Sequence, residues 1–313
     1  MKKVLLTLLA LALLPVFAFA QDCPTPASVT ATVTFKRRSN DPVFSVSSTT
    51  KVQFSQGNLQ YQASTNTWRF AERQYDMIGA DNSNISSSYT GWIDLFGWAT
   101  SGNSESGTNY QPYSTGISNY EYGQTSQPSS GQWNAAKSDW GQNMVPADYW
   151  RTLSSAEWTY LLNTRTTTAT IEGVPNARFM RAKILTDGNV GTDGVNYNIL
   201  GLILFPDNYS GDKPEGVTWS VANVNTYAWN FMGACTCTTA GWAALEAAGC
   251  VFLPCAGYRD NTTITSIGTE GFYWSSTASS SANANCLYFA INSPISSQER
   301  HRGHSVRLVH VVE

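Results

Sequence analysis

Alternating apolar and polar residues dominate the region after residue 43 and predict short β-strands. The alternation recurs over residues 44–47, 51–54, 59–61 and 67–70, and Gly57-Asn58 supplies a turn between two of these stretches. A period of two residues is typical of a strand with one buried face. The pattern therefore predicts a small antiparallel meander at the start of the folded region.

A helix is predicted where this period changes. Ser154 and Glu157 have the spacing of a capping box, in which the serine caps the first turn and the glutamate reaches back to the serine. Trp158, Leu161 and Leu162 then follow at the i, i+3, i+4 spacing of one helical face.

A second helix and several strands are expected in the second half of the chain. Residues 239–248 place Trp242 and Leu245 on one helical face, and Gly249 provides a stop. The apolar run at 201–205 predicts a buried central strand. Further strands are predicted at 251–253, 272–275, 287–291 and 305–312.

These elements indicate an α+β fold with about two helices, small and mainly antiparallel sheets, and long loops. Residues 80–140 are rich in Ser, Asn, Gly, Tyr and Trp with little periodicity, so we expect loops packed through their own aromatic side chains. We expect a single domain over residues 43–313, after a leader or linker at 21–42.

The N-terminus has the three parts of a signal peptide. Lys2-Lys3 is the basic part, residues 4–17 are apolar, and Ala18-Phe19-Ala20 matches a cleavage site. The apolar run is shorter than the roughly 18 residues that span a bilayer. We therefore expect residues 1–20 to be removed and the protein to be exported to the periplasm, the cell surface or the medium. We expect no membrane span in the mature chain.

Charge narrows the classes of partner. Only 13% of residues are charged, and the net charge of −3 becomes −5 when Lys2 and Lys3 are removed. A chain without a basic cluster lacks the electrostatic footprint for nucleic acid or for an anionic membrane surface. An aromatic content of 12% argues against a disordered chain.

The six cysteines are predicted to form disulfides if the protein is exported, because an even number of cysteines in an oxidising compartment favours disulfide bonds. The sequence leaves the pairing open. A four-thiolate zinc site is disfavoured because the spacing lacks the usual CxxC pairs. Besides Cys23, the disulfide candidates are Cys235, Cys237, Cys250, Cys255 and Cys286.

Five motifs follow one another in the second half of the chain. They are Trp150-Arg-Thr-Leu153 with Glu157-Trp158, Gly201-Leu-Ile-Leu-Phe-Pro-Asp207, Phe252-Leu-Pro-Cys-Ala-Gly-Tyr-Arg259, Gly271-Phe-Tyr-Trp-Ser-Ser-Thr277 and Arg300-x-x-Gly303-x-Ser-Val-Arg-Leu-Val309. In order and spacing they resemble secreted C-type-lectin-fold proteins of gut Bacteroidetes, in the branch of the formylglycine-generating enzymes and the Fibrobacter paralogous domains. The resemblance covers about residues 43–312 and implies a C-type-lectin-like domain.

Within these motifs most residues are expected to be structural. Arg259 and Arg307 are expected to pair with carboxylates or carbonyl groups. Gly257 and Gly303 are expected where the backbone is tightly packed and leaves no room for a side chain. The expected core residues are Trp158, Phe252, Trp274 and Leu308.

The enzymes of this branch use a C-terminal pair of cysteines to bind copper, but the last 50 residues contain only Cys286. His301, His304 and His310 are the only histidines, and their placement in a loop and a strand disfavours a metal site. Residues 187–194 could form a calcium loop but lack the spacing and terminal glutamate of an EF-hand. We therefore expect a non-enzymatic protein without a cofactor.

A Ser-, Asn- and Tyr-rich stretch near the C-terminus is the predicted ligand-binding face. Such residues combine rigid contact area with adaptable hydrogen bonds, so we expect an adhesin-like or lectin-like protein that recognises a glycan or protein at the cell surface. The alternative is a metal- or thiol-dependent enzyme on the formylglycine-generating fold. The expected ligand-binding residues are Tyr273, Trp274, Ser276, Asn283, Asn285, Tyr288, Asn292, Arg300 and His301.

Overall fold

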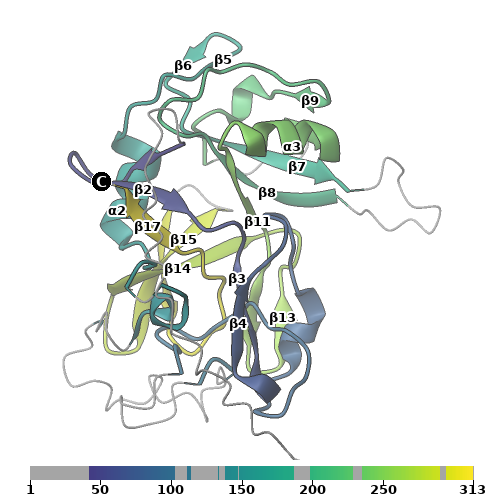
Figure 1. The fold of residues 1–313 in the computed structure, drawn as a ribbon, viewed down its shortest axis with the longest axis vertical. Coiled ribbons are helices and arrows are strands. Elements are labelled where there is room, and N and C mark those ends of the chain that lie inside the picture. The colour runs from purple at the N-terminus through teal and green to yellow at the C-terminus, as the bar shows by residue number, and fades with distance from the viewer. Residues whose placement is uncertain are drawn as a thin grey trace, which may run out of the picture. The chain divides into compact units, whose positions relative to one another are not determined.

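The computed structural model contains a five-stranded mixed sheet (Figure 1). This sheet separates two apolar clusters. The structure describes residues 42–102, 111–113, 133, 138–146, 148–186, 198–227, 235–289 and 294–312; the signal segment and nearly all of the leader lie outside them. The strand order is β11–β8–β7–β10–β9, with only β10 and β7 parallel. The strands are β7 Phe179–Leu185, β8 Asn198–Leu204, β9 Val217–Thr218, β10 Cys235–Thr238 and β11 Val251–Pro254.

The first predicted helix is confirmed together with its capping box. In α2 (Ser155–Thr159) the Ser154 side chain accepts a hydrogen bond from the Glu157 amide, and the Glu157 carboxylate accepts one from the Ser154 amide. Helical structure continues as a π-helix over Tyr160–Thr164. The reciprocal bonds satisfy two amides that the helix itself leaves free.

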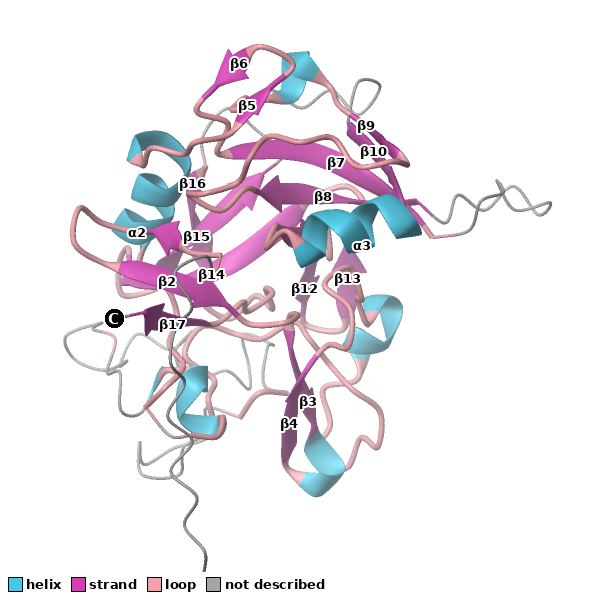
Figure 2. Ribbon diagram, turned by 45° about the horizontal axis from the view of Figure 1, so that its top comes forward, coloured by secondary structure: helices cyan, strands magenta, loops and turns pink. Residues whose placement is uncertain are grey.

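The second predicted helix is α3 (Thr239–Ala247), which lies against the five-stranded sheet (Figure 2). Thr238 caps it by accepting a hydrogen bond from the Gly241 amide. Gly249 follows with a φ of 89°, a conformation that favours glycine. A Cβ there would also lie 2.1 Å from the Pro42 ring, so glycine is required twice over.

Both faces of the five-stranded sheet are covered, which explains the unbroken apolar run at 201–205. Ile203 lies in one apolar cluster with Trp242 of α3, whereas Leu202 lies in a second cluster with Trp158 of α2. Alternate side chains of β8 thus enter different clusters, and neither face has polar positions to create a period of two.

A three-stranded antiparallel sheet, β14–β15–β16, borders the other side of the second cluster. Tyr273 and Leu287 belong to that cluster, whereas Trp274 and Cys286 belong to a third one. This sheet is therefore also buried on both faces near its middle. Its strands are β14 Gly271–Ala278, β15 Asn283–Phe289 and β16 Ile295–Glu299.

The expected N-terminal meander is wrong in its pairing. The strands split into a sheet β1–β2–β17 and a separate hairpin β3–β4. The C-terminal segment causes the split: the Ser55 amide donates to the Leu308 carbonyl at 2.8 Å, and the Leu59 amide donates to the Val306 carbonyl at 2.9 Å. The strand predicted over 305–312 is observed only over Val309–Val312, as β17. The strands are β1 Phe44–Ser45, β2 Lys51–Phe54, β3 Leu59–Gln62, β4 Thr67–Phe70 and β17 Val309–Val312.

Loops in the described part of residues 80–140 pack through aromatic side chains, as the sequence predicts. The Trp98 and Trp140 indoles are fully buried and donate to the carbonyls of Ser275 and Thr100. No helix within the described ranges has the length and apolarity needed to cross a bilayer. The remaining elements are β5 Thr170–Ile171, β6 Val174–Pro175, β12 Tyr258–Asp260, β13 Thr263–Thr265 and 3-10 helices at Ala63–Thr65, Gly79–Ser83, Trp140–Asn143 and Val221–Asn223.

Arg307 joins three segments through its buried guanidinium group. Nε donates to the Asn58 side chain at 3.0 Å and Nη1 donates to the Ser55 carbonyl at 3.2 Å. Nη2 donates to the carbonyls of Gln74 and Phe252 at 3.2 and 2.8 Å. The predicted pairing of this arginine with carbonyl groups is confirmed, and it fixes the N-terminal strands against β11.

Arg259 on β12 has an equivalent role for a second set of loops. Its guanidinium group, fully buried, donates to the carbonyls of Asn82 and Leu95, both at 2.7 Å. Its backbone exchanges two hydrogen bonds with Gly303. A Cβ on Gly303 would approach the Arg259 side chain to 3.0 Å, which confirms that this glycine permits a close backbone approach.

Replacing Arg259 by methionine should lower the free energy of unfolding by about 2–5 kcal/mol, because the buried carbonyl groups of Asn82 and Leu95 lose the guanidinium donors that Arg259 provides. Urea denaturation measures this change. Arg73→Met is the matched control, because the Arg73 side chain is 65% exposed and its ion pair with Asp76 contributes little. Equal stability of the two variants would contradict a structural role for Arg259.

Asp94 lies beside this arginine and is fully buried. Its carboxylate accepts hydrogen bonds from the Asn82 side chain at 2.7 Å and from the Ile78 amide at 3.0 Å. Desolvation outweighs these bonds and the nearby Arg259 charge, and raises the pKa of Asp94 to about 6.

This raised pKa predicts a pH dependence of stability. Between about pH 4 and pH 6 the folded protein holds a proton that the unfolded chain has released, so the free energy of unfolding falls as pH rises, by about 3 kcal/mol. Urea denaturation at pH 4 and pH 7 should show a smaller fall for Asp94→Asn than for the wild type. The exposed control Asp212→Asn should behave as the wild type. An unchanged profile in Asp94→Asn would contradict the assignment.

Candidate functional site

The structure separates the residues predicted for the ligand-binding face. Tyr273 and Trp274 have at most 1% of their surface exposed, because β14 is covered on both faces, so they are core residues and form no part of a surface. Arg300 and His301 are also buried, and Asn292 lies outside the described residues. The half-buried residues of the predicted set are Ser276, Asn283, Asn285 and Tyr288.

An exposed turn at residues 279–282 joins β14 to β15. The amides of Ser279 and Ser280 both donate to the Asn283 carbonyl, and the Ser280 hydroxyl accepts from the Asn283 amide. The Ser279 and Ser297 hydroxyls are 2.8 Å apart, which connects the turn to β16. We call residues 279–283 together with Asn285 and Ser297 the hairpin surface.

Arg300 holds the hairpin surface from beneath. Its Nε donates to the Asn283 carbonyl at 3.1 Å, and its Nη2 donates to the Ser280 carbonyl. The guanidinium carbon also lies 4.4 Å from the centre of the Trp98 ring. The exposed turn therefore rests on a buried cation that is anchored in the third apolar cluster.

A row of stacked aromatic rings lies beside the β14–β15–β16 sheet and extends from the buried His304 to the half-buried Tyr288. The His304 ring stacks on Trp274 with a centroid distance of 4.1 Å and lies 4.9 Å from Phe272, which stacks in turn on Tyr288 at 4.4 Å. Burial lowers the pKa of His304, so the imidazole is neutral at neutral pH. The Tyr288 hydroxyl donates to the Glu270 carboxylate at 2.6 Å.

A cluster of charged residues borders the hairpin surface at the end of β16. Arg302 Nη2 lies 2.9 Å from the Glu299 carboxylate, and His301 Nε2 lies 3.7 Å from Asp260 and 4.0 Å from Glu299. No sequence motif marks Asp260, Glu299 or Arg302 as site residues. Asp260 comes from β12, so no local motif could connect it with residues 299–302.

The five described cysteines are free thiols and all are buried. Cys235 and Cys237 are closest, with their sulfurs 3.7 Å apart on β10. Cys250, Cys255 and Cys286 lie in three different apolar clusters, and all three are free thiols in this structure. Burial raises the pKa of each of these three thiols, which disfavours the reactive thiolate.

The three histidines do not form a common site. His301 faces Asp260, His304 is enclosed by rings, and His310 stacks on Tyr149 with a centroid distance of 4.3 Å. Across the described ranges, no group of three or more His, Cys, Asp or Glu side chains is placed to hold a metal ion. The proposed calcium loop at 187–194 lies outside those ranges.

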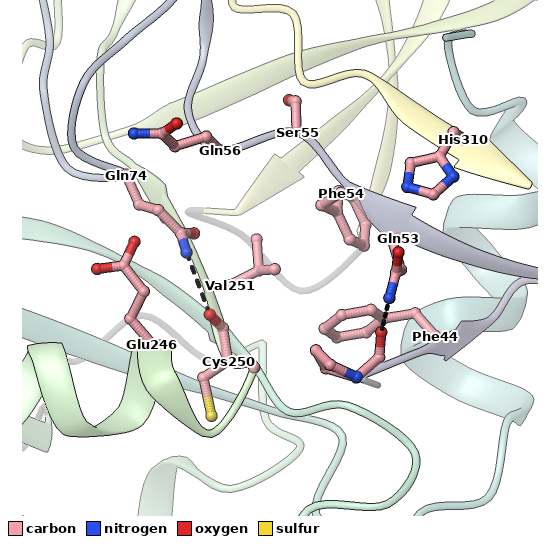
Figure 3. A pocket seen from close by; sticks show the side chains of 12 residues that line it. Phe44, Gln53, Phe54, Ser55, Gln56, Gln74, Glu246, Cys250, Val251 and His310 are labelled. Carbon is pink, nitrogen blue, oxygen red and sulfur yellow. Dashed lines mark hydrogen bonds between the residues drawn. The ribbon is translucent and has the colours of Figure 1, made fainter. Parts of the chain in front are cut away.

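A separate cavity of about 210 Å³ opens between β2, β17, α3 and the start of β11 (Figure 3). Its wall includes the Phe54 ring, the Gln53 and Gln74 amides, and the Glu246 carboxylate. No sequence motif marks it, because its residues come from four segments far apart in the chain.

Comparisons with protein-family profiles, curated proteins and solved structures give no match to this chain. The structure shows a mixed α+β fold, and the finer resemblance to the C-type-lectin fold stays a prediction.

The buried free thiols predict slow alkylation of the native protein. Iodoacetamide should label Cys235, Cys237, Cys250, Cys255 and Cys286 only after unfolding in urea without reductant, because the native core excludes the reagent. Mass spectrometry of the digested protein counts the labels. Disulfide-linked peptides among these five in an unreduced digest would instead support the pairing that export predicts.

Proposed function

We propose that this chain is an exported, non-enzymatic ligand-binding protein of the C-type-lectin-like type, which recognises a glycan or protein through the hairpin surface. The observation that carries the proposal is the hairpin surface itself. Its side chains at 280, 281, 283, 285 and 297 are uncharged hydroxyl or amide groups, and Arg300 holds their backbone from beneath. A rigid support under adaptable polar groups is the arrangement that specific recognition needs.

Register within the sheet supports a contiguous contact area. Asn285 lies opposite Ser297 and Asn283 lies opposite Glu299 on the β15–β16 pair. The Asn285 side chain has no hydrogen bond to the described residues, so its amide is free to contact a ligand. The charged cluster of Asp260, Glu299 and Arg302 provides a polar rim beside it.

Burial of the thiols supports binding over thiol chemistry. A nucleophilic cysteine needs an accessible sulfur and a depressed pKa. The three thiols of Cys250, Cys255 and Cys286 are buried, so their sulfurs are not accessible. Their pKa values are raised, so the thiolate is disfavoured. The alternative of a thiol-dependent enzyme therefore gains no support from these three residues.

A glycan array and a panel of cell-surface proteins, screened with the mature protein, test the proposal. Ser281→Arg and Asn285→Ala should each weaken binding of the best ligand at least about tenfold, because one blocks the surface and the other removes a contact. The matched control is Ala243→Arg, an equally bulky change at an exposed position of α3.

Unfolding free energies of all three variants should stay within about 0.5 kcal/mol of the wild type. Unweakened binding by both hairpin variants would exclude this surface as the site. The absence of any ligand in both screens would overturn the proposed function.

A further inference from the structure

The cavity beside β2 is lined by amide, hydroxyl, carboxylate and apolar side chains. Each of its three amide groups donates to a backbone carbonyl: Gln53 Nε2 to Pro42 at 3.0 Å, Gln56 Nε2 to Glu72 at 2.6 Å and Gln74 Nε2 to Cys250 at 3.2 Å. The Gln74 oxygen accepts from the Phe252 amide at 2.7 Å. The Gln53 oxygen is left as an acceptor at the wall (Figure 3).

Glu246 adds a carboxylate at the opposite side of the cavity, and its side chain points toward Gln74 (Figure 3). The carboxylate has no hydrogen bond or ion pair to the described residues. Its charge interacts with that of Arg307, but all three guanidinium nitrogens of Arg307 already donate to Asn58 and to three backbone carbonyls. Two carboxylate oxygens therefore face the cavity without donors.

The remaining wall supplies no competing cation. No Lys or Arg is among the lining residues, and burial lowers the pKa of His310, so that its ring is neutral at neutral pH. Phe54 is half-buried and, with Val251, forms an apolar side. A cavity volume of about 210 Å³ leaves room for a ligand larger than a single water.

We propose that this cavity is a second binding site, distinct from the hairpin surface, which takes an aliphatic ammonium group. The ammonium group donates to the Glu246 carboxylate, and the alkyl chain lies against Val251 and Phe54. A carboxylate ligand would meet like charge, and a neutral alcohol would offer the Glu246 carboxylate one donor and no charge.

Three probes of equal chain length and different charge test the site: butylammonium, butanol and butyrate, each titrated into the full mature protein at pH 7.5 by NMR. Butylammonium should bind with a dissociation constant at least about tenfold lower than those of butanol and butyrate. Glu246→Gln should weaken butylammonium binding at least about tenfold and leave hairpin-surface ligands unaffected. Glu172→Gln is the matched control, since Glu172 is exposed and pairs with Lys213 elsewhere.

Gln53→Met gives an independent reading, because it keeps the side-chain length and removes the neutral amide on the wall opposite Glu246, together with its bond to the Pro42 carbonyl. It should weaken butylammonium binding less than Glu246→Gln does. Equal affinities for the three probes, equal effects of Glu246→Gln and Glu172→Gln, or no saturable binding to the wild type would each overturn the proposal.

A lysine with capped termini distinguishes the source of the ammonium group. Binding of the capped lysine as tight as that of butylammonium supports a lysine side chain of a protein partner. Binding of butylammonium alone supports a free amine. In Ser281→Arg and Asn285→Ala, loss of hairpin-surface binding without loss of butylammonium binding would show that the two sites are separate.

Discussion

Five arginines are buried in the described part of this protein, and the order of its loops depends on the four with the least exposed surface. Arg165, Arg259, Arg300 and Arg307 each have at most 1% of their surface exposed. A buried cation is costly unless its donors are used, and here most of the acceptors are backbone carbonyls of segments far apart in sequence. Each arginine therefore fixes loops that have few regular hydrogen bonds of their own.

Arg165 shows how this works next to a carboxylate. Its Nη1 lies 2.9 Å from Asp207, which also accepts from the amide and hydroxyl of Ser45. Nη2 donates to the Arg178 carbonyl, and Nε to the Leu161 carbonyl. One guanidinium thus joins the π-helix that follows α2, the residue before β7 and, through Asp207, the strand β1. The chain has 19 Lys and Arg residues, and burying five of them leaves even less charge on a surface that is already poor in it.

Local signals in the sequence predicted the elements that close over short distances. The Ser154–Glu157 capping box, the stop at Gly249 and the apolar run at 201–205 each became the expected helix, helix end or buried strand. The predicted carbonyl-pairing role of Arg259 and Arg307 is also confirmed. These features depend on residues within a few positions, or on a charge that must find partners when buried.

Long-range pairing was not predictable in the same way. Nothing in the alternation of residues 44–70 shows that the C-terminal segment pairs with β2, and Tyr273 and Trp274 look amphipathic in sequence although both faces of β14 are covered. The cavity at Glu246 and the charged cluster at Asp260 likewise join segments that only the fold brings together.

Hydrogen–deuterium exchange on Arg300→Met tests most directly whether a buried guanidinium holds the hairpin surface rigid. Loss of its bonds to the Asn283 and Ser280 carbonyls should speed amide exchange at residues 279–284 by at least about tenfold, while β7 and β8 exchange as in the wild type. Unchanged exchange at residues 279–284, or an equal acceleration throughout the chain, would contradict this role.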